Sequence, residues 1–238
     1  MPLIRRLGRG AAQIAVTCAL VSVSIRAEAQ DSPAEARRDA RAELAEATQA
    51  FRKVMRAQPI PPALLERAVA VGVLEGLVQA AFIVGGHGGD GIITRRLADG
   101  SWSAPAFVKV GGATIGAQIG GSQTDVVLLF MTKKAVDSLL DNRLEFGSDI
   151  VAVAGTAQAS ANTNAPGDDV LAFSNNEGLF AGAALKGAVI TPDNDLNRAV
   201  YNASADVILS GRTAITPPAG LELFNEELAR ATRATAAR

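Results

Sequence analysis

The sequence has few of the side chains on which catalytic and metal sites usually depend. Its 238 residues include one cysteine, Cys18, and one histidine, His87, and aromatic residues make up only 4%. A single cysteine excludes a disulfide framework and a multi-thiolate metal site. A single histidine excludes chemistry that needs a pair of imidazoles. The formal net charge of −1 argues against a nucleic-acid binder, which needs a strong cationic field.

Two apparent chemical motifs also lack the sequence context that their chemistry requires. Residues 86–91 have the G-x-G-x-x-G spacing, but the residues that follow, 92–97, are typical of a strand rather than of the helix that a dinucleotide site needs. Gly88–Gly91 is therefore interpreted as a hairpin turn. Residues 193–197 begin like a calcium loop, but Arg198 replaces its glycine, so they are interpreted as a helix N-terminus. We expect a protein that is not an enzyme and holds neither a metal nor a cofactor.

The first 29 residues are typical of a secretory signal peptide. Three arginines (Arg5, Arg6 and Arg9) precede an apolar run over 11–25, and Ala27-Glu28-Ala29 offers a cleavage site after Ala29. The run is shorter than the roughly 20 residues of a membrane span, and a retained anchor is the alternative. Cleavage removes the cysteine and changes the net charge from −1 to −4. A cysteine-free exported protein suits the periplasm or cell envelope, where thiols oxidise.

The mature chain, residues 30–238, reads as a single domain with three parts. The helical lead, 33–70, has an apolar stripe at helical spacing over 33–58, with Asp31 or Ser32 as its cap, and a short second helix from 63 to 70. The β body, 71–190, alternates apolar strands with glycine turns such as 98–100, and contains one helix over 132–142 capped by Thr132. The helical tail, 193–233, has helices at 193–201, 205–209 and 219–232. This order predicts an α+β fold with an antiparallel sheet or a barrel-like body.

Six motifs, in order, carry a resemblance to a known family. They are G-G-D-G-I at 88–92, D-G-S-W-S-A-P-A at 99–106, G-G-x-x-x-G-x-Q-x-G at 111–120, the D-x-V-x-L-x-M strand at 125–131, G-L-F-A-G at 178–182 and D-x-N-x-x-V-Y at 195–201. From about residue 38 to residue 230 the chain resembles the SYLF lipid-binding domain, which occurs in yeast actin-binding proteins with Src-homology-3 modules and in exported bacterial proteins. The chain is similar to the bacterial exported branch.

The resemblance implies non-catalytic binding of membrane phospholipid, through an anionic headgroup, an acyl chain or both. Eukaryotic members look specific for phosphoinositides, and some bind actin. Where those relatives tend to carry lysines, this chain has Val69, Val71 and Gln79, and residues 155–158 replace their G-P-x-G stretch. Strong phosphoinositide selectivity is therefore not expected. Actin binding is not expected either, because a periplasm offers no actin to bind. The alternative function is a structural or protein-interaction module of the envelope, and the sequence leaves the oligomeric state open.

Seven cations are the candidate lipid-binding residues. Arg52, Lys53 and Arg56 lie at the end of the lead helix beside Phe51 and Val54, which either dock on the protein's own sheet or reach lipid. Near an anionic membrane each cation can contribute about 1 kcal/mol. The other four candidates are two adjacent pairs, for which simple solvation is the alternative: Arg95, Arg96, Lys133 and Lys134. Trp102, the single tryptophan, either anchors at a membrane interface or packs in the core.

Overall fold

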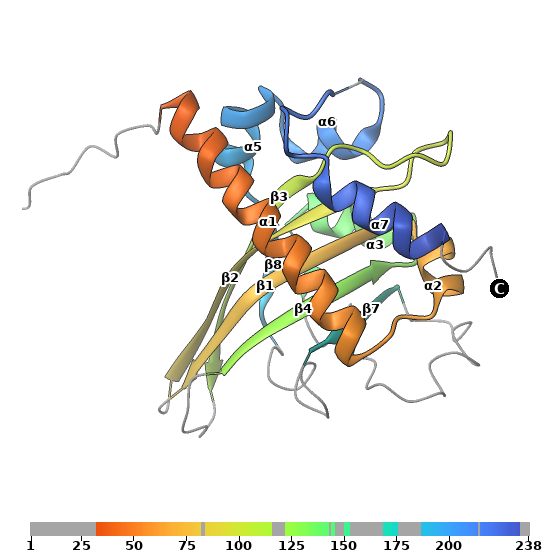
Figure 1. Ribbon diagram of the computed structural model, residues 1–238. Coiled ribbons are helices and arrows are strands. Elements are labelled where there is room, and N and C mark those ends of the chain that lie inside the picture. Colours follow the sequence, from red (N-terminus) through yellow and green to blue (C-terminus); the bar gives the residue numbers. More distant parts are fainter. Residues whose placement is uncertain are drawn as a thin grey trace, which may run out of the picture. The chain divides into compact units, whose positions relative to one another are not determined.

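The computed structural model describes residues 32–81, 84–115, 122–142, 144–145, 150–152, 169–175, 187–213 and 215–233. Within these ranges the chain forms six helices and eight strands in an α+β arrangement (Figure 1), as the sequence predicts. The helices are α1 (Pro33–Ala57), α2 (Pro62–Arg67), α3 (Lys133–Leu140), α5 (Asn194–Tyr201), α6 (Ala205–Ser210) and α7 (Leu223–Arg233). The strands are β1 (Ala70–Ala81), β2 (Val84–Arg95), β3 (Ala106–Ile115), β4 (Ser122–Phe130), β5 (Leu144–Glu145), β6 (Ile150–Ala152), β7 (Val170–Ser174) and β8 (Val189–Pro192).

The strands form one curved sheet in the order β5-β8-β3-β2-β1-β4-β7-β6. Every neighbouring pair is antiparallel except β6 and β7, which run parallel. Parallel neighbours need a long connection, and the chain between Ala152 and Val170 provides one. The predicted antiparallel sheet is therefore correct, apart from one strand at its edge.

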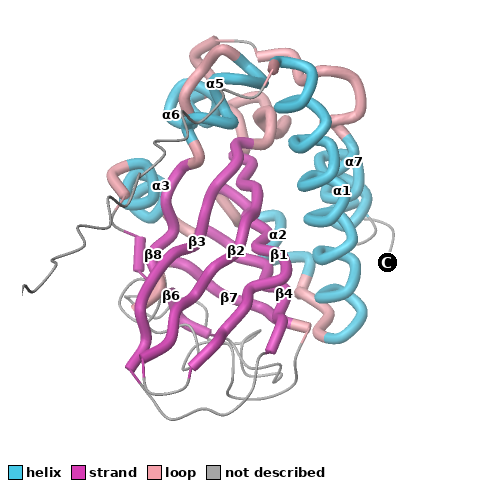
Figure 2. The backbone as a smooth tube through the Cα atoms, turned by 90° about the vertical axis from the view of Figure 1, so that its left-hand side faces the viewer, coloured by secondary structure: helices cyan, strands magenta, loops and turns pink. Residues whose placement is uncertain are grey.

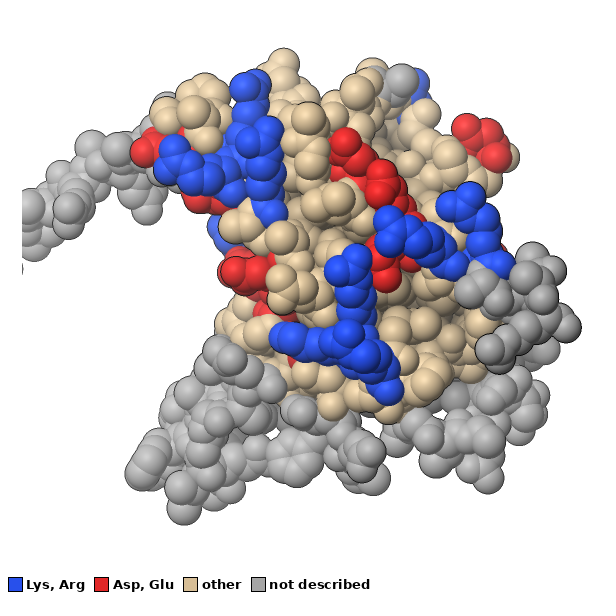
Figure 3. Space-filling view, viewed as in Figure 1, with Lys and Arg blue, Asp and Glu red and all other residues tan. Residues whose placement is uncertain are grey.

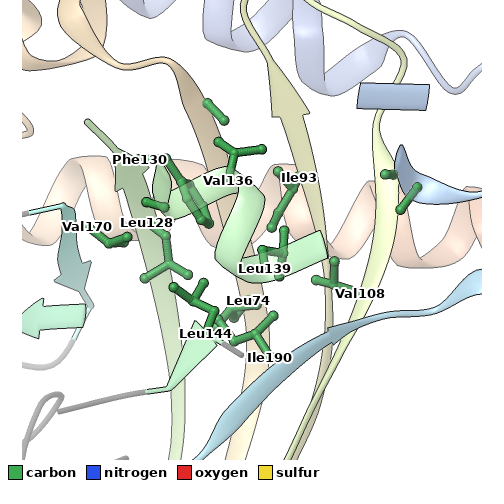
Figure 4. Close-up of a cluster of buried hydrophobic side chains, with 14 of the residues drawn as sticks. Leu74, Ile93, Val108, Leu128, Phe130, Val136, Leu139, Leu144, Val170 and Ile190 are labelled. Carbon is green, nitrogen blue, oxygen red and sulfur yellow. The ribbon is translucent and has the colours of Figure 1, made fainter. Parts of the chain in front are cut away.

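Helices cover both faces of the sheet, as Figure 2 shows for α1 and α7 on one side and α3 on the other. On the first face α1, α2 and α7 bury Phe51, Leu65 and Phe224 against central strands. On the opposite face α3 and α6 bury side chains such as Val136 and Leu139 against β1, β4 and β8 (Figure 4). The central strands are apolar on both faces because each face packs against a helix.

Local capping chemistry determines where the long helix α1 begins. The Ser32 hydroxyl accepts a hydrogen bond from the backbone N–H of Glu35, and the Glu35 carboxylate accepts one from the backbone N–H of Ser32. This reciprocal pair is a capping box, and Pro33 occupies the first turn, where its missing N–H costs nothing. The helix ends before Pro59. The stripe on its inner face is fully buried, so Phe51 and Val54 dock on the sheet and do not face a membrane.

The predicted hairpin turn at Gly88–Gly91 is wrong, because these residues lie inside β2 and pair with both β1 and β3. Their glycines serve close packing instead. A Cβ atom on Gly91 would overlap the carbonyl oxygen of Val73 and lie 2.9 Å from Leu74 Cδ2. The other predicted turn, at 98–100, is confirmed, since the Gly100 N–H donates to the carbonyl oxygen of Leu97 at 3.0 Å. Residues 116–120 of the third family-like motif and the whole of the G-L-F-A-G motif at 178–182 lie outside the described residues.

Candidate functional site

The three cations on α1 lie together on its last two turns. All three side chains are exposed, at the lower end of α1 where Figure 3 shows a group of basic residues. The side chains of Arg52 and Lys53 remain 47% and 52% exposed although each forms an ion pair. Arg56 forms no ion pair with any residue that the structure describes. Because the apolar face of α1 is docked, this helix offers the solvent a basic polar end rather than an insertable apolar face.

A shared carboxylate joins α1 to α7. Glu227 Oε2 lies 2.7 Å from Arg52 Nη2 and 3.0 Å from Arg230 Nη1. The hydrogen bond from Arg52 lowers the pKa of Glu227, and the same bond raises the pKa of Arg52. Arg230 also reaches Glu226 Oε2, at 3.3 Å. The cationic end of α1 therefore continues through Glu227 onto the charged surface of α7.

Lys53 forms an ion pair with Asp125, and Asp125 in turn bonds to two further parts of the fold. Its Nζ lies 3.1 Å from Asp125 Oδ2 on β4. Asp125 Oδ1 accepts a hydrogen bond from the backbone N–H of Gly76, and Asn175 Nδ2 donates to Asp125 Oδ2. Gly76 interrupts β1 as a bulge and has a φ of +53°, a conformation that favours glycine. Asp125, the first residue of the fourth family-like motif, thus ties α1, the β1 bulge and the end of β7.

Arg95 and Arg96 reach opposite faces of the sheet, as adjacent residues of a strand do. Arg95 Nη1 donates to the carbonyl oxygen of Leu209 at the end of α6. Arg96 donates from Nε to the carbonyl oxygen of Ala68 and from Nη2 to that of Leu65, so its guanidinium caps the C-terminus of α2. The structure gives both side chains backbone partners at helix ends.

Lys133 and Lys134 lie at the start of α3, on the face of the sheet opposite α1. Lys133 forms an ion pair with Asp137 at 2.7 Å, one turn along the same helix, and Lys134 forms one with Asp169 at 3.1 Å. Thr132 caps α3, as predicted, by accepting from the N–H of Ala135. The structure therefore brings three of the seven candidate cations together on α1 and distributes the other four over both faces.

A groove between α7 and the β2–β3 connection was not found from the sequence. It has a volume of about 710 Å³ and lies between one face of α7 and the turn that ends at Trp102. Its lining residues are Arg96, Gly100, Ser101, Trp102, Glu222, Asn225, Glu226, Ala229, Arg230, Thr232 and Arg233. The sequence signal that could have indicated it is the spacing of charged residues at 222, 226, 230 and 233, which places them on one side of a helix.

Carboxylates gather beneath the middle of α1. Burial, followed by the charges of Asp90 and Asp193, raises the pKa of Glu43 to about 8, and Lys109 opposes this shift. Burial, followed by the charges of Glu43 and other acidic neighbours, raises the pKa of Glu75 to about 9. Within the described residues no three acidic, histidine or cysteine side chains are arranged to hold a metal ion. Nor is any described helix long and apolar enough to cross a membrane.

The helix-covered sheet, with its cationic helix end and its polar groove, defines a small α+β binding domain. A family model described as Ysc84, "Las17-binding protein actin regulator", matches residues 111–231, just over half of the chain. The chain belongs to this Ysc84 family, also known by its SYLF domain, which is a family of non-catalytic binding domains. The resemblance that the motifs predict is confirmed at this level.

Yeast and human proteins are among the similar sequences. LAS seventeen-binding protein 3 of Saccharomyces cerevisiae is 37% identical over 173 residues, which are 69% of this chain and 37% of the relative. Protein YSC84 of the same yeast is 35% identical over 170 residues, 68% of this chain and 36% of the relative. Human SH3 domain-containing YSC84-like protein 1 is 29% identical over 146 residues, 60% of this chain and 42% of the relative. The chain therefore matches little more than a third of each yeast relative.

Proposed function

We propose that this protein is a non-catalytic peripheral binder of anionic phospholipid membranes, exported to the cell envelope of a bacterium. The observation that carries the proposal is the basic end of α1. Arg52, Lys53 and Arg56 are exposed side by side; Arg52 and Lys53 each form an ion pair with one carboxylate but keep about half of the side chain exposed, and Arg56 forms no ion pair within the described residues. The export part rests on the composition of residues 1–29.

The charge of the α1 end favours surface attraction over insertion. The apolar stripe of α1 is occupied by the protein's own core, so the free energy of membrane binding must come from cations near anionic headgroups. Such an attraction weakens as salt increases, because the Debye length falls from about 30 Å at 0.01 M to about 8 Å at physiological ionic strength. We therefore propose a reversible, salt-sensitive association with the surface of the bilayer.

The proposal is tested by co-sedimentation of the purified protein with vesicles. Vesicles of phosphatidylglycerol and phosphatidylcholine are compared with vesicles of phosphatidylcholine alone, at low and at physiological salt. We expect sedimentation with the anionic vesicles and its reduction by salt. Absence of binding to anionic vesicles at low salt would overturn the proposal. N-terminal sequencing of the protein from the periplasmic fraction tests export, with Gln30 expected as the first residue.

A second candidate function is a protein-interaction module of the envelope. It is favoured by the description of the family as Las17-binding, which names a protein partner. To test it, the protein is crosslinked in cells and purified. Recovery of one defined protein partner, together with no binding to any of the vesicles, would support this function over the first.

A further inference from the structure

One face of α7 lines the groove and is open to solvent. The row of side chains along this face has spacings of three and four residues and consists of Glu222, Glu226, Ala229 and Arg233. Ala229, near the middle of the row, is small enough to let a second helix come close. Beside the row, Leu223 is 48% exposed, and it is the one large apolar side chain that lies exposed within the described parts of the chain. The face therefore offers a partner an accessible row of charges and an apolar contact.

The charges along the row change sign from one end of α7 to the other. Glu222 directly precedes the helix and Arg233 ends it. Figure 3 shows acidic side chains giving way to basic ones along this helix. This order suits the dipole of the helix itself, which favours anions at the N-terminus and cations at the C-terminus. The same order makes the row complementary in charge to a copy of itself that runs in the opposite direction.

The charges at the two ends of the row are not neutralised by ion pairs within the described residues, whereas those in the middle are. In the middle, Arg230 bridges Glu226 and Glu227, at 3.3 and 3.0 Å. Neither Glu222 nor Arg233 forms an ion pair with another residue that the structure describes. The two lie 11 positions apart, which is about 16 Å along a helix, so they are too far apart to pair with each other. Their charges remain available to a second molecule.

We infer that α7 is a self-association face, through which two copies of this chain pair with their α7 helices antiparallel and Glu222 of each copy facing Arg233 of the other. A twofold axis through the middle of the paired helices forms both contacts at once, because such an interface uses the same patch on each copy. Leu223 of one copy then lies beside the aliphatic stem of Arg233 of the other. The positive end of each helix dipole also lies beside the negative end of the other.

A second copy fits this face better than an unrelated partner does, because the row is complementary to its own sequence in reverse. Position 222 meets position 233, and position 226 meets position 230, so each acidic residue faces a basic one. Glu226 and Arg230 can take part without losing their present bonds, since a carboxylate accepts several hydrogen bonds and a guanidinium has five N–H donors. Exposed ion pairs contribute little singly, so the dimer should be weak, reversible and sensitive to salt. The inference goes beyond the proposed function and does not depend on it.

Sedimentation velocity of the purified full chain tests the pairing. It is measured over a wide range of protein concentration, at low and at physiological salt. We expect monomer to convert reversibly to dimer as the concentration rises, with dimerisation about fivefold weaker at physiological salt because screening shortens the reach of the charges. Trp102, the single tryptophan of the chain, lines the same groove, so its emission reports the same transition. A monomer at every concentration at low salt would overturn the inference.

Reversal of single charges identifies the interface. Glu222→Arg alone or Arg233→Glu alone puts like charges together at both ends of the pair, and we expect each change to weaken dimerisation about tenfold. Arg212→Glu changes the net charge as Arg233→Glu does, but Arg212 is an exposed residue outside the groove, so this control should leave dimerisation unchanged. Thermal unfolding confirms that each variant is folded.

A mixture of the two reversed variants distinguishes the antiparallel pair from any other arrangement. Glu222→Arg supplies two arginines to the two glutamates of Arg233→Glu, so an equimolar mixture should dimerise as strongly as the wild type. The double variant Glu222→Arg/Arg233→Glu should recover in the same way with itself. Glu222 also accepts a hydrogen bond from the Gly220 N–H at 2.9 Å, and recovery in the mixture shows that loss of this bond does not cause the weakening. Dimerisation that is unaffected by the single reversals, or is not restored in the mixture, would overturn the inference.

Discussion

The side-chain amide of Asn197 forms hydrogen bonds with both the backbone N–H and the backbone carbonyl oxygen of Phe107. Asn197 Oδ1 accepts from the Phe107 N–H at 2.9 Å, and Asn197 Nδ2 donates to the Phe107 carbonyl oxygen at 2.9 Å, in a fully buried setting. The amide therefore imitates a neighbouring strand at the start of β3. The N–H of Asp193 donates to the same carbonyl oxygen, so the stretch that resembles a calcium loop fastens α5 to the sheet.

Replacing the amide of Asn197 should destabilise the fold and leave the cations at the end of α1 unchanged. Asn197→Ala leaves the buried Phe107 N–H without its partner, and we expect a loss of about 1–3 kcal/mol in the free energy of unfolding. Urea unfolding measures the loss. Arg198→Ala, its exposed neighbour on the same helix, is the matched control and should change stability by no more than about 0.5 kcal/mol. Equal effects of the two changes would show that the paired hydrogen bonds contribute nothing.

The glycine within β2 should be needed for packing rather than for a turn. Gly91→Ala places a methyl group against the Val73 carbonyl oxygen, and we expect a destabilisation of about 2–4 kcal/mol. Gly88→Ala lies in the same strand but has no atom within 4 Å of its added Cβ, so it should be nearly neutral. The two variants are compared by thermal unfolding. A tolerated alanine at 91 would refute the close approach of β1.

The buried carboxyls beneath α1 should make the protein less stable as the pH rises. The pKa values of Glu43 and Glu75 are raised from 4.5 to about 8 and about 9, so the folded state retains protons that the unfolded chain has lost. Their stabilising contribution is complete below about pH 4.5 and disappears as the pH rises through 8 to 9.

Glu75→Gln tests this pH dependence, because the amide cannot ionise. Both carboxyls are partly solvated, so we expect a gain of only about 1–2 kcal/mol at pH 8 and a flatter dependence of stability on pH between 5 and 9. Urea unfolding at a series of pH values provides the measurement. Asp39→Asn removes an exposed carboxyl from α1, one turn before Glu43, and should leave the slope unaltered. An identical slope in wild type and Glu75→Gln would contradict the prediction.

The basic end of α1 should dominate binding to anionic vesicles. Arg52→Gln with Arg56→Gln removes two charges while sparing Lys53, on which buried Asp125 depends. We expect vesicle affinity at low salt to fall about tenfold or more, at about 1 kcal/mol for each cation. Lys133→Gln with Lys134→Gln removes the same charge from the opposite face. If that control pair loses as much affinity, binding depends on overall charge and not on this surface.

The local elements could be predicted because their causes are local. Ser32 and Glu35 complete a capping box within four residues, Thr132 caps α3, and the apolar stripe of α1 marks its buried face. The glycines at 88–91 were misread because turns and tightly packed strands can use the same residues. Only the close contact of Val73 with Gly91, 18 positions apart in the sequence, distinguishes a tightly packed strand from a turn at these glycines.

The surroundings of the candidate cations depend on contacts between distant parts of the chain. Lys53 meets Asp125 across 72 positions, and Arg52 meets Glu227 across 175. Nothing in the sequence around Arg96 indicates that it caps α2 through Leu65. The basic residues could therefore be named from the sequence, whereas their partners and the groove beside α7 required the assembled fold.

The acidic residues beneath α1 also affect the isoelectric point. With Glu43 and Glu75 protonated at neutral pH, the folded chain carries two fewer negative charges than its formula, so −1 becomes +1 for the full chain and −4 becomes −2 for residues 30–238. Native protein should therefore focus at a higher pH than the same chain in urea. Folding itself makes this protein less repelled by an anionic surface than its sequence alone would suggest.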